Sequence, residues 1–378
     1  MDFNYSEMQQ MLLDSAGKLI ADTYTLDDIR HQRTFANGLN DKNWAQFAEL
    51  GWLALPIPEE AGGLGCGLED VVVLSTMLGR GLAVEPYVSS VVVGGHILGA
   101  IADEDARNVI LGQIATGEAR IALAHGEPGE RFADSGARTT TAVAAGNGFT
   151  LTGKKMLALD GPSATHLIVS ATLEDGSLGL FLSARDAEGI SDENYALVDG
   201  AAASDLFLAG VHVDAGALIA SGAAAETLLA EASDRAAIAL MAQAVGAMEA
   251  CNDVCAAYIK ERKQFGQAIG KFQALQHIMA EMFVSTHQAR SMVYYALAHV
   301  DASVEERQAA VSAAKVLVGK AAQTVSRSGI QLHGGYGVTD EYIVSHYYRR
   351  LLSLEKLFGD IDHHARRLAV HMFDQEAA

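Results

Sequence analysis

In the C-terminal part of the chain, apolar residues recur at helical spacing, most clearly over about 272–297. Similar 3.6-residue patterns cover about 225–260, 304–330 and 348–373. These four stretches are free of proline, which a long helix excludes. They predict four long helices with short connections, the pattern of a four-helix bundle. The clearest stripe contains Phe272, Leu275, Ile278, Met279, Met282, Phe283, Ala289, Met292, Val293 and Leu297.

The middle of the chain alternates at a different period and is rich in β-branched residues. Residues 139–159 and 166–184 each contain a turn dipeptide, Asn147-Gly148 in the first and Asp175-Gly176 in the second. Such dipeptides favour two-residue type I′ hairpin turns. A further β-like run extends from Asp205 to Val213. Several antiparallel strands within about 90 residues predict a small barrel or sandwich.

The first 120 residues return to helical periodicity, so the order is helical, then β, then helical. We therefore expect a mainly α fold with a central β-domain. The predicted domains are an N-terminal α-helical domain at 1–120, a middle β-domain at 121–215 and a C-terminal four-helix bundle at 222–378. The small residues near 215–225 are the best candidate for a linker.

Charge restricts the partners of the chain. Lysine and arginine total 27 against 47 aspartate and glutamate residues, a formal net charge of −20. Nucleic acids and anionic membranes are bound through basic patches, so neither is expected as a partner. A local basic pocket for a small phosphorylated ligand is compatible with this charge.

Cysteine content and hydropathy predict a cytoplasmic protein without a membrane span. Cys66, Cys251 and Cys255 are too few for a disulfide framework, and the first ten residues lack a signal-peptide pattern. The longest nearly apolar stretch, Ala236 to Met248, is shorter than the about 20 residues that a membrane helix needs.

Three segments are candidates for binding chemistry. Arg262 to Gly266 ends one predicted helix, and its arginine offers a fork of donors for phosphate oxygens. Gln331 to Gly337 has three glycines that expose backbone N–H groups to a pyrophosphate or an aromatic cofactor. His125 to Gly129 is a turn at the entrance to the β-region. Taken singly, they are also explained as a helix C-cap, a loop between helices and a simple turn.

No metal site is expected. His363 and His364 lie beside each other on a late helix, where neighbouring side chains point in different directions, so surface polarity is the better explanation. Cys251 and Cys255, one turn apart on an apolar helix, are predicted to be core thiols.

Taken together and in this order, these segments resemble the acyl-CoA dehydrogenase family of flavoenzymes. The resemblance covers essentially the whole chain and rests on five elements. These are Leu50 to Gly65, Glu127-Pro-Gly129, Gly153-Lys-Lys-Met156, Arg262-x-x-Phe-Gly266 with Phe272-Gln273, and Gln331-x-x-Gly-Gly335.

The resemblance implies a helical domain, a β-domain and a four-helix bundle that packs into a tetramer, with FAD held partly between subunits. The residues expected along the isoalloxazine ring are Leu123, Ala124, Gly126, Phe132, Leu157, Ala158 and Leu159. Arg262, Gln264 and Phe265 are expected at the pyrophosphate and adenine end of a neighbouring subunit's FAD. Gln331, Gly334 and Gly335 are expected to touch the same cofactor.

Several positions depart from the family pattern. Gly126 stands for a threonine, Phe132 replaces a serine that reaches a phosphate, and Leu157 replaces a tryptophan beside the flavin. These departures weaken single assignments more than the assignment of the fold.

The catalytic carboxylate is the most informative departure. The family reaction moves an α-proton to a carboxylate and a β-hydride to flavin N5. Counting from Gln331 places the usual glutamate at Phe358, which cannot accept a proton. Asp234, before Arg235, resembles a second base position of the family after a two-residue shift, and it is our candidate. Asp360 and Glu355 are alternates, and all three are alternatively solvated helix carboxylates.

The resemblance leaves three functions open. The first is an FAD-dependent acyl-CoA dehydrogenase of the fatty acid metabolism type, a homotetramer that passes electrons to an electron-transfer flavoprotein. The second is an FAD-sharing subunit of a heterotetramer, because Phe-Gly-Asp at Phe358 resembles the small subunit of pimeloyl-CoA-type and steroid side-chain dehydrogenases. The third is a flavin monooxygenase or nitroalkane oxidase on the same fold. The sequence does not identify the acyl group of the substrate.

Overall fold

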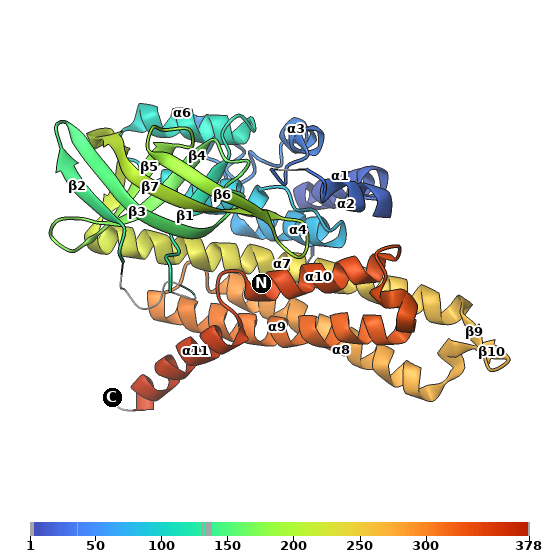
Figure 1. The fold of residues 1–378 in the computed structure, drawn as a ribbon. Coiled ribbons are helices and arrows are strands. Elements are labelled where there is room, and N and C mark those ends of the chain that lie inside the picture. Colours follow the sequence, from blue (N-terminus) through green and yellow to red (C-terminus); the bar gives the residue numbers. More distant parts are fainter. Residues whose placement is uncertain (1–3, 36, 130–131, 133–137, 377–378) are drawn as a thin grey trace. The chain divides into compact units, whose positions relative to one another are not determined.

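The computed structural model describes residues 4–35, 37–129, 132 and 138–376. Contacts divide the chain into two compact units (Figure 1). The first unit comprises Met1–Arg30, Leu68–Ala83 and Ala237–Ala378, and the second comprises His31–Gly67 and Val84–Ala236. The predicted mainly α fold with a central β-region is confirmed, whereas the exact domain boundaries remain predictions.

The first unit is helical. In order along the chain it contains α1 (Glu7–Thr23), most of α2 (Leu26–Gln32), α4 (Leu68–Arg80), the second part of α7 (Gly222–Glu261), α8 (Gln273–Ala298), α9 (Val304–His333), α10 (Ile343–Lys356) and α11 (Ile361–Glu376). Between α7 and α8 lie the short strands β9 (Lys263–Gln264) and β10 (Gln267–Ala268) and the 3-10 helix η4 (Ile269–Lys271). Another 3-10 helix, η5 (Gly334–Val338), follows α9.

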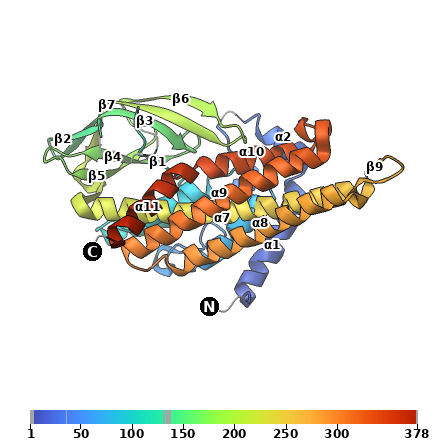
Figure 2. The ribbon, with the colours of Figure 1, turned by 90° about the horizontal axis from the view of Figure 1, so that it is seen from below.

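Capping residues and apolar stripes explain where these helices begin and how they pack. Ser303 starts α9 with a reciprocal capping box to Glu306, and Ser6 starts α1 in the same way with Gln9. Both views show α8 and α9 side by side (Figures 1 and 2). The buried apolar residues of these two helices include Met282, Ala289, Val293, Val311, Ala314 and Val318. Cys251 and Cys255 are buried free thiols, as predicted.

The helix predicted over 348–373 is not continuous. It is divided between α10 and α11 by a turn at Leu357 to Asp360. Phe358 and Gly359 have φ angles of 53° and 98°, which a right-handed helix does not contain. The apolar pattern crosses this break without a change of period, so periodicity alone missed it.

The second unit contains an eight-stranded sheet. Its helices are α3 (Asp41–Glu49), the 3-10 helix η1 (Glu59–Ala61), the π-helix η2 (Val88–Gly94), α5 (Gly95–Leu98), α6 (Glu104–Ala115), the 3-10 helix η3 (Ala215–Ala217) and the start of α7. Its strands are β1 (Ile121–Ala124), β2 (Thr141–Ala145), β3 (Gly148–Leu159), β4 (His166–Thr172), β5 (Leu178–Ala184), β6 (Ile190–Ala196), β7 (Ala202–Asp214) and β8 (Leu218–Ser221).

The sheet has the order β6-β7-β3-β2-β4-β5-β8, and β1 pairs in parallel with β4. The long strands β3 and β7 are antiparallel and carry register shifts after Leu151 and Lys155. Alternate residues enter a core that includes Leu151, Val169, Phe181, Leu206 and Val211. Lys155 lies on this inward side of β3.

The predicted hairpins form with different turns. The β2–β3 turn falls at Gly146 and Asn147, one residue before the predicted dipeptide, and Gly146 has φ 63°. Strands β4 and β5 are joined by the longer loop 173–177, closed by a hydrogen bond from Leu173 N to Ser177 O. The expected linker near 215–225 contains η3, β8 and the start of α7. Among the described residues, no helix combines the length and apolar character that crossing a membrane requires.

Candidate functional site

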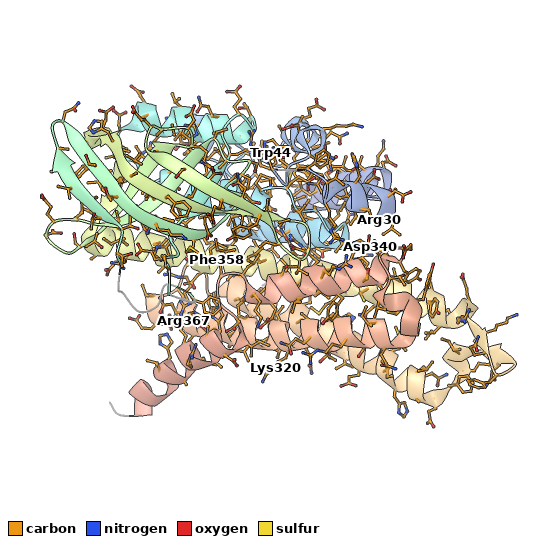
Figure 3. All side chains as sticks on the ribbon, in the orientation of Figure 1. Arg30, Trp44, Lys320, Asp340, Phe358 and Arg367 are labelled. Atoms are coloured by element: carbon orange, nitrogen blue, oxygen red, sulfur yellow. The ribbon has the colours of Figure 1, made fainter. Side chains whose placement is uncertain are left out.

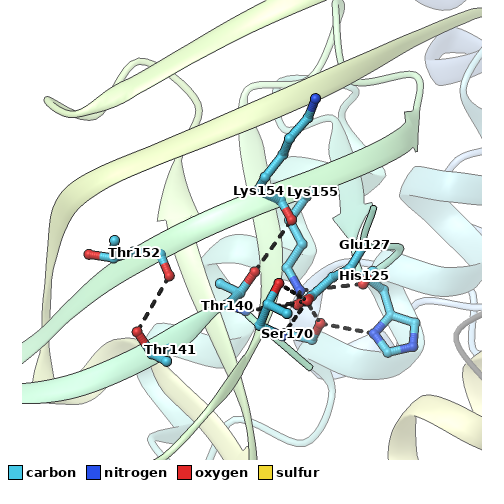
Figure 4. Close-up of polar contacts among 9 residues, drawn as sticks. His125, Glu127, Thr140, Thr141, Thr152, Lys154, Lys155 and Ser170 are labelled. Carbon is cyan, nitrogen blue, oxygen red and sulfur yellow. Dashed lines mark hydrogen bonds and ion pairs between the residues drawn. The ribbon is translucent and has the colours of Figure 1, made fainter. Parts of the chain in front are cut away.

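A buried polar cluster holds the segment that contains Glu127-Pro-Gly129 (Figure 4). Lys155 Nζ lies 2.6 Å from Glu127 Oε1 and also donates to Ser170 Oγ at 3.0 Å. The second carboxylate oxygen of Glu127 accepts from the Thr139 hydroxyl at 2.6 Å and from the Thr139 backbone N–H. Thr140 N donates to the same carboxylate. Glu127 therefore joins the two chain segments on either side of residues 130–137.

Hydrogen bonds and burial set the charge states in this cluster. Burial alone would raise the pKa of Glu127, but hydrogen bonds from Lys155 and Thr139 outweigh it and lower the pKa to about 2. Burial, reinforced by the Lys155 charge, lowers the pKa of His125 to about 4. His125 is thus neutral at pH 7, with Nδ1 2.9 Å from Ser170 Oγ.

After Lys155, the pairing of β3 with β7 shifts in register, and two backbone N–H groups of β3 bond to other partners. Met156 N donates to Gly126 O at 2.8 Å, which ties the strand to the segment before Glu127. Leu157 has a left-handed φ of 53°, is 48% exposed, and its N–H donates to Asp205 Oδ1 at 3.1 Å. Tyr195 donates its hydroxyl to the same oxygen at 2.9 Å.

The second unit places most of the predicted isoalloxazine residues on two neighbouring segments. Leu123, Ala124 and Gly126 belong to β1 and the residues after it, and Leu157, Ala158 and Leu159 end β3. Ala124 and Ala158 are fully buried, so their side chains pack inside the second unit. Phe132 is half-buried, and its neighbours in sequence lie outside the described residues.

In the first unit, the predicted phosphate-binding segment forms an exposed hairpin. Helix α7 ends at Glu261, and Phe265 and Gly266 turn between β9 and β10 with φ angles of 52° and 80°. Phe265 is 91% exposed and contacts Phe272 edge-on, with ring centroids 6.1 Å apart. Arg262 and Gln264 are exposed as well.

The glycine-rich segment lies beside the end of α7. Gly334 ends α9 with φ 60°, and a Cβ at Gly334 or Gly335 would meet nothing within 4 Å. Gln331 is also exposed. His333, between Gln331 and Gly334 in the sequence, is buried. Its ring centroid lies 4.1 Å from that of Tyr258 of α7 and 4.8 Å from that of Tyr342. This aromatic cluster brings the Gln331 and Arg262 segments to the same end of α7 and α9.

The three candidate carboxylates are all buried, so the alternative explanation that they are solvated helix carboxylates is wrong. Asp234 on α7 is 1% exposed. Glu355 Oε1 accepts from Ile361 N at 3.1 Å, and Asp360 Oδ1 accepts from His363 N at 2.9 Å. Glu355 and Asp360 therefore cap the start of α11. Phe358 stands between them with no proton-accepting group.

Sequence reasoning missed several residues of these clusters. His364 was expected at the surface, but it is 1% exposed and bonds to Phe358 O and Ser312 Oγ. Thr139, Ser170 and Asp205 carried no motif. One available signal was Lys155, a lysine at an inward position of an alternating strand. Among the described residues, no group of three or more histidine, cysteine, aspartate or glutamate side chains could hold a metal ion.

Comparisons with known proteins identify the family of the chain. The acyl-CoA dehydrogenase N-terminal domain matches residues 6–118, and the acyl-CoA dehydrogenase C-terminal domain matches residues 227–373. The solved Tcur3481–Tcur3483 steroid ACAD variant is 30% identical, with a TM-score of 0.87 over 98% of this chain and 99% of that one. The chain belongs to the acyl-CoA dehydrogenase family.

Further relatives cover nearly the whole chain. The caffeyl-CoA reductase–Etf complex subunit CarC of Acetobacterium woodii is 28% identical over 91% of this chain and 93% of its own length. A glutaryl-coenzyme A dehydrogenase complex is 23% identical, covers 99% of this chain and 97% of that one, and has a TM-score of 0.91, which supports the fold. The protein is an oxidoreductase acting on CH–CH groups, in a family of FAD-dependent flavoproteins.

Some of the residues expected to bind FAD have the chemistry that this cofactor needs, and others do not. Arg262 and Gln264 offer side-chain donors on an exposed turn, and Gly334 and Gly335 leave backbone groups free of steric cover. Phe132 and Leu159 offer no side-chain hydrogen bond to a flavin, so this chain would rely on backbone groups at those two positions.

Proposed function

We propose that the chain binds FAD and catalyses α,β-dehydrogenation of an acyl-CoA thioester. The observation that carries this proposal is the shared position of the Arg262 and Gln331 segments, which the His333 cluster holds at one end of α7 and α9. Both motifs belong to the family pattern and both present donors or bare backbone to solvent. When bound, FAD supplies the acceptor for the β-hydride.

The residues of the chain then have separate roles. Arg262 and Gln264 bind phosphate and adenine groups, and Gln331, Gly334 and Gly335 contact the same nucleotide. The segments Leu123 to Gly126 and Leu157 to Leu159 lie along the isoalloxazine ring, on a backbone fixed by Glu127 and Lys155.

Asp234 is the proposed base for the α-proton. The support is its position before Arg235, which resembles the second base position of the family, and its burial on α7. Asp234 would take the proton as the neutral thioester acquires enolate character.

The test is anaerobic bleaching of the flavin by a panel of acyl-CoA thioesters. Asp234→Asn should lower the bleaching rate by about a thousandfold, in the range that loss of a general base costs. Glu226→Gln, an exposed carboxylate on the same helix, is the matched control and should bleach like wild type. Full activity of Asp234→Asn would remove the proposed base. The panel includes unsaturated thioesters with reduced flavin, because CarC is named a caffeyl-CoA reductase.

A second candidate follows from Phe358. The chain would share FAD sites with a related subunit that carries the glutamate, in a heterotetramer instead of a homotetramer. The name of the Tcur3481–Tcur3483 relative, with two components, supports this arrangement. It predicts little activity alone, recovery on co-expression with a glutamate-bearing partner, and no effect of Asp234→Asn in the complex.

The proposed electron acceptor is an electron-transfer flavoprotein, since CarC is named as a subunit of a reductase–Etf complex. Reoxidation of the substrate-reduced flavin should then be much faster with such a flavoprotein than with oxygen. Rapid oxygen consumption with hydroxylated products would favour a monooxygenase or oxidase instead.

A further inference from the structure

The turn between α10 and α11 has an unusual backbone. Phe358, labelled in Figure 3, has a left-handed φ of 53° that residues with side chains rarely adopt. Gly359 follows with φ 98°, and a Cβ there would lie 2.5 Å from the ring of His363. Such a conformation persists only where the surroundings determine it.

Two buried side chains hold the carbonyl groups of this turn. Lys315 of α9 donates to Leu357 O at 2.8 Å and to the carbonyl oxygens of Leu354 and Glu355 at 3.4 Å. His364 Nε2 lies 2.9 Å from Phe358 O. Because a carbonyl oxygen only accepts, Nε2 must carry the proton.

The other ring nitrogen of His364 bonds to a residue of α9. With Nε2 protonated and the imidazole neutral, His364 Nδ1 accepts from the Ser312 hydroxyl at 3.2 Å. Burial, with the nearby Lys315 charge, lowers the pKa of His364 to about 3, so the ring keeps this arrangement at neutral pH. The histidine is thus fixed from two sides.

These contacts involve the backbone of the turn and not the side chain of Phe358. The ring is half-buried and has no aromatic partner among the residues that the structure describes. A large apolar side chain therefore stands on a rigid backbone without being part of the core. Rigid backbone under a partly exposed side chain is what selection between ligands requires.

We propose that Lys315 and His364 are positioning residues that fix the Phe358 ring as a wall of the acyl site. The wall excludes CoA thioesters branched at the carbon next to the thioester. This inference rests on the proposed function, because motif counting places position 358 where the family's base meets the α-carbon. A phenyl ring fills space there that a carboxylate leaves open.

The experiment compares kcat/KM per bound flavin for a straight-chain thioester and its α-methyl isomer. Phe358→Ala should shift the ratio toward the branched substrate by about tenfold or more, the range for one methyl group in a pocket. His364→Leu and Lys315→Met should shift it in the same direction, with a change in KM as well as kcat. His364→Gln keeps a donor near the Nε2 position and should restore most of the wild-type ratio.

A double variant distinguishes positioning from a general loss of structure. In the Phe358→Ala background, His364→Leu should change the ratio no further, because its effect passes through the missing ring. Lys320→Met, an exposed lysine on the same helix, should behave like wild type. An equal ratio in wild type and Phe358→Ala, or additive effects in the double variant, overturns the proposal.

Hydrogen exchange of residues 354–364 gives a readout that does not depend on catalysis. His364→Leu should speed exchange at the turn by about tenfold, and unchanged exchange would show that the cluster does not hold it. If no thioester bleaches the wild-type flavin, with or without a partner subunit, the proposed function fails. The exchange result still decides whether the turn is held by His364 and Lys315.

Discussion

The two units each contain a buried lysine, a neutral histidine bonded to a serine hydroxyl, and a glutamate, but they satisfy the lysine differently. In the second unit, Lys155 forms an ion pair with Glu127 at 2.6 Å. In the first unit, Lys315 donates to three backbone carbonyls, and the Glu355 carboxylate acts on it through its charge, without a direct hydrogen bond.

The difference shows in the charge of the second lysine. Burial without a directly bonded carboxylate lowers the pKa of Lys315 to about 8, although the charges of Glu355 and Asp360 oppose this shift. A buried ammonium ion held by carbonyls is therefore close to losing its proton. We therefore expect the charge pair to supply most of the stability of the Glu127 cluster, and hydrogen bonds to supply most of the stability of the Lys315 cluster.

The largest expected effect is that of Lys155→Met. It leaves the Glu127 carboxylate buried without its counter-ion, which costs about 3–5 kcal/mol of unfolding free energy. Urea unfolding measures this loss. The Lys155→Met, Glu127→Gln double variant should recover part of it, because no uncompensated charge remains. A loss below 1 kcal/mol in the single variant would show that the pair does not stabilise this segment.

Lys315→Met should cost less, about 1–3 kcal/mol, because the lost hydrogen bonds are partly offset by removal of a buried charge. Its pH dependence is the sharper test. The folded pKa of about 8 lies below the usual 10.5, so the unfolded chain binds more protons between these values. Wild-type stability relative to Lys315→Met should therefore rise with pH across this window, by about 1 kcal/mol per unit.

Lys320→Met is the control for this measurement and should follow wild type within about 0.5 kcal/mol at every pH. A flat difference between wild type and Lys315→Met from pH 8 to 10.5 would mean that Lys315 keeps its proton in the folded state. The proposed contrast with Lys155 would then fail.

The smallest expected effect concerns acid. The pKa values of His125 and His364 fall from 6.5 to about 4 and about 3, so both are neutral in the fold and gain a proton on unfolding. Each makes stability fall as pH drops below 6.5, by about 1 kcal/mol per unit. His364→Gln should remove its share of this slope between pH 6 and 4, measured by urea unfolding. An unchanged slope would place a charged His364 in the fold.

Periodicity predicted the helical and β regions correctly because burial of one face imposes a repeat on the sequence. Local chemistry also marked the end of α9 at Gly334 and the end of α7 before Arg262. It failed at Phe358, since the left-handed turn is stabilised by Lys315, which is 43 residues earlier in the chain. Nothing in the local sequence marks that contact.

The sequence by itself determined the family, the order of the regions, the two segments proposed to bind the nucleotide and the absence of a carboxylate at position 358. Those properties depend on residue type and on spacing along the chain. Only the tertiary structure decided that Glu355 and Asp360 cap α11, that His364 is buried, and that Lys155 and Lys315 have different partners. Hydrogen bonds and desolvation act over a few ångströms, so they depend on which distant segments folding brings together.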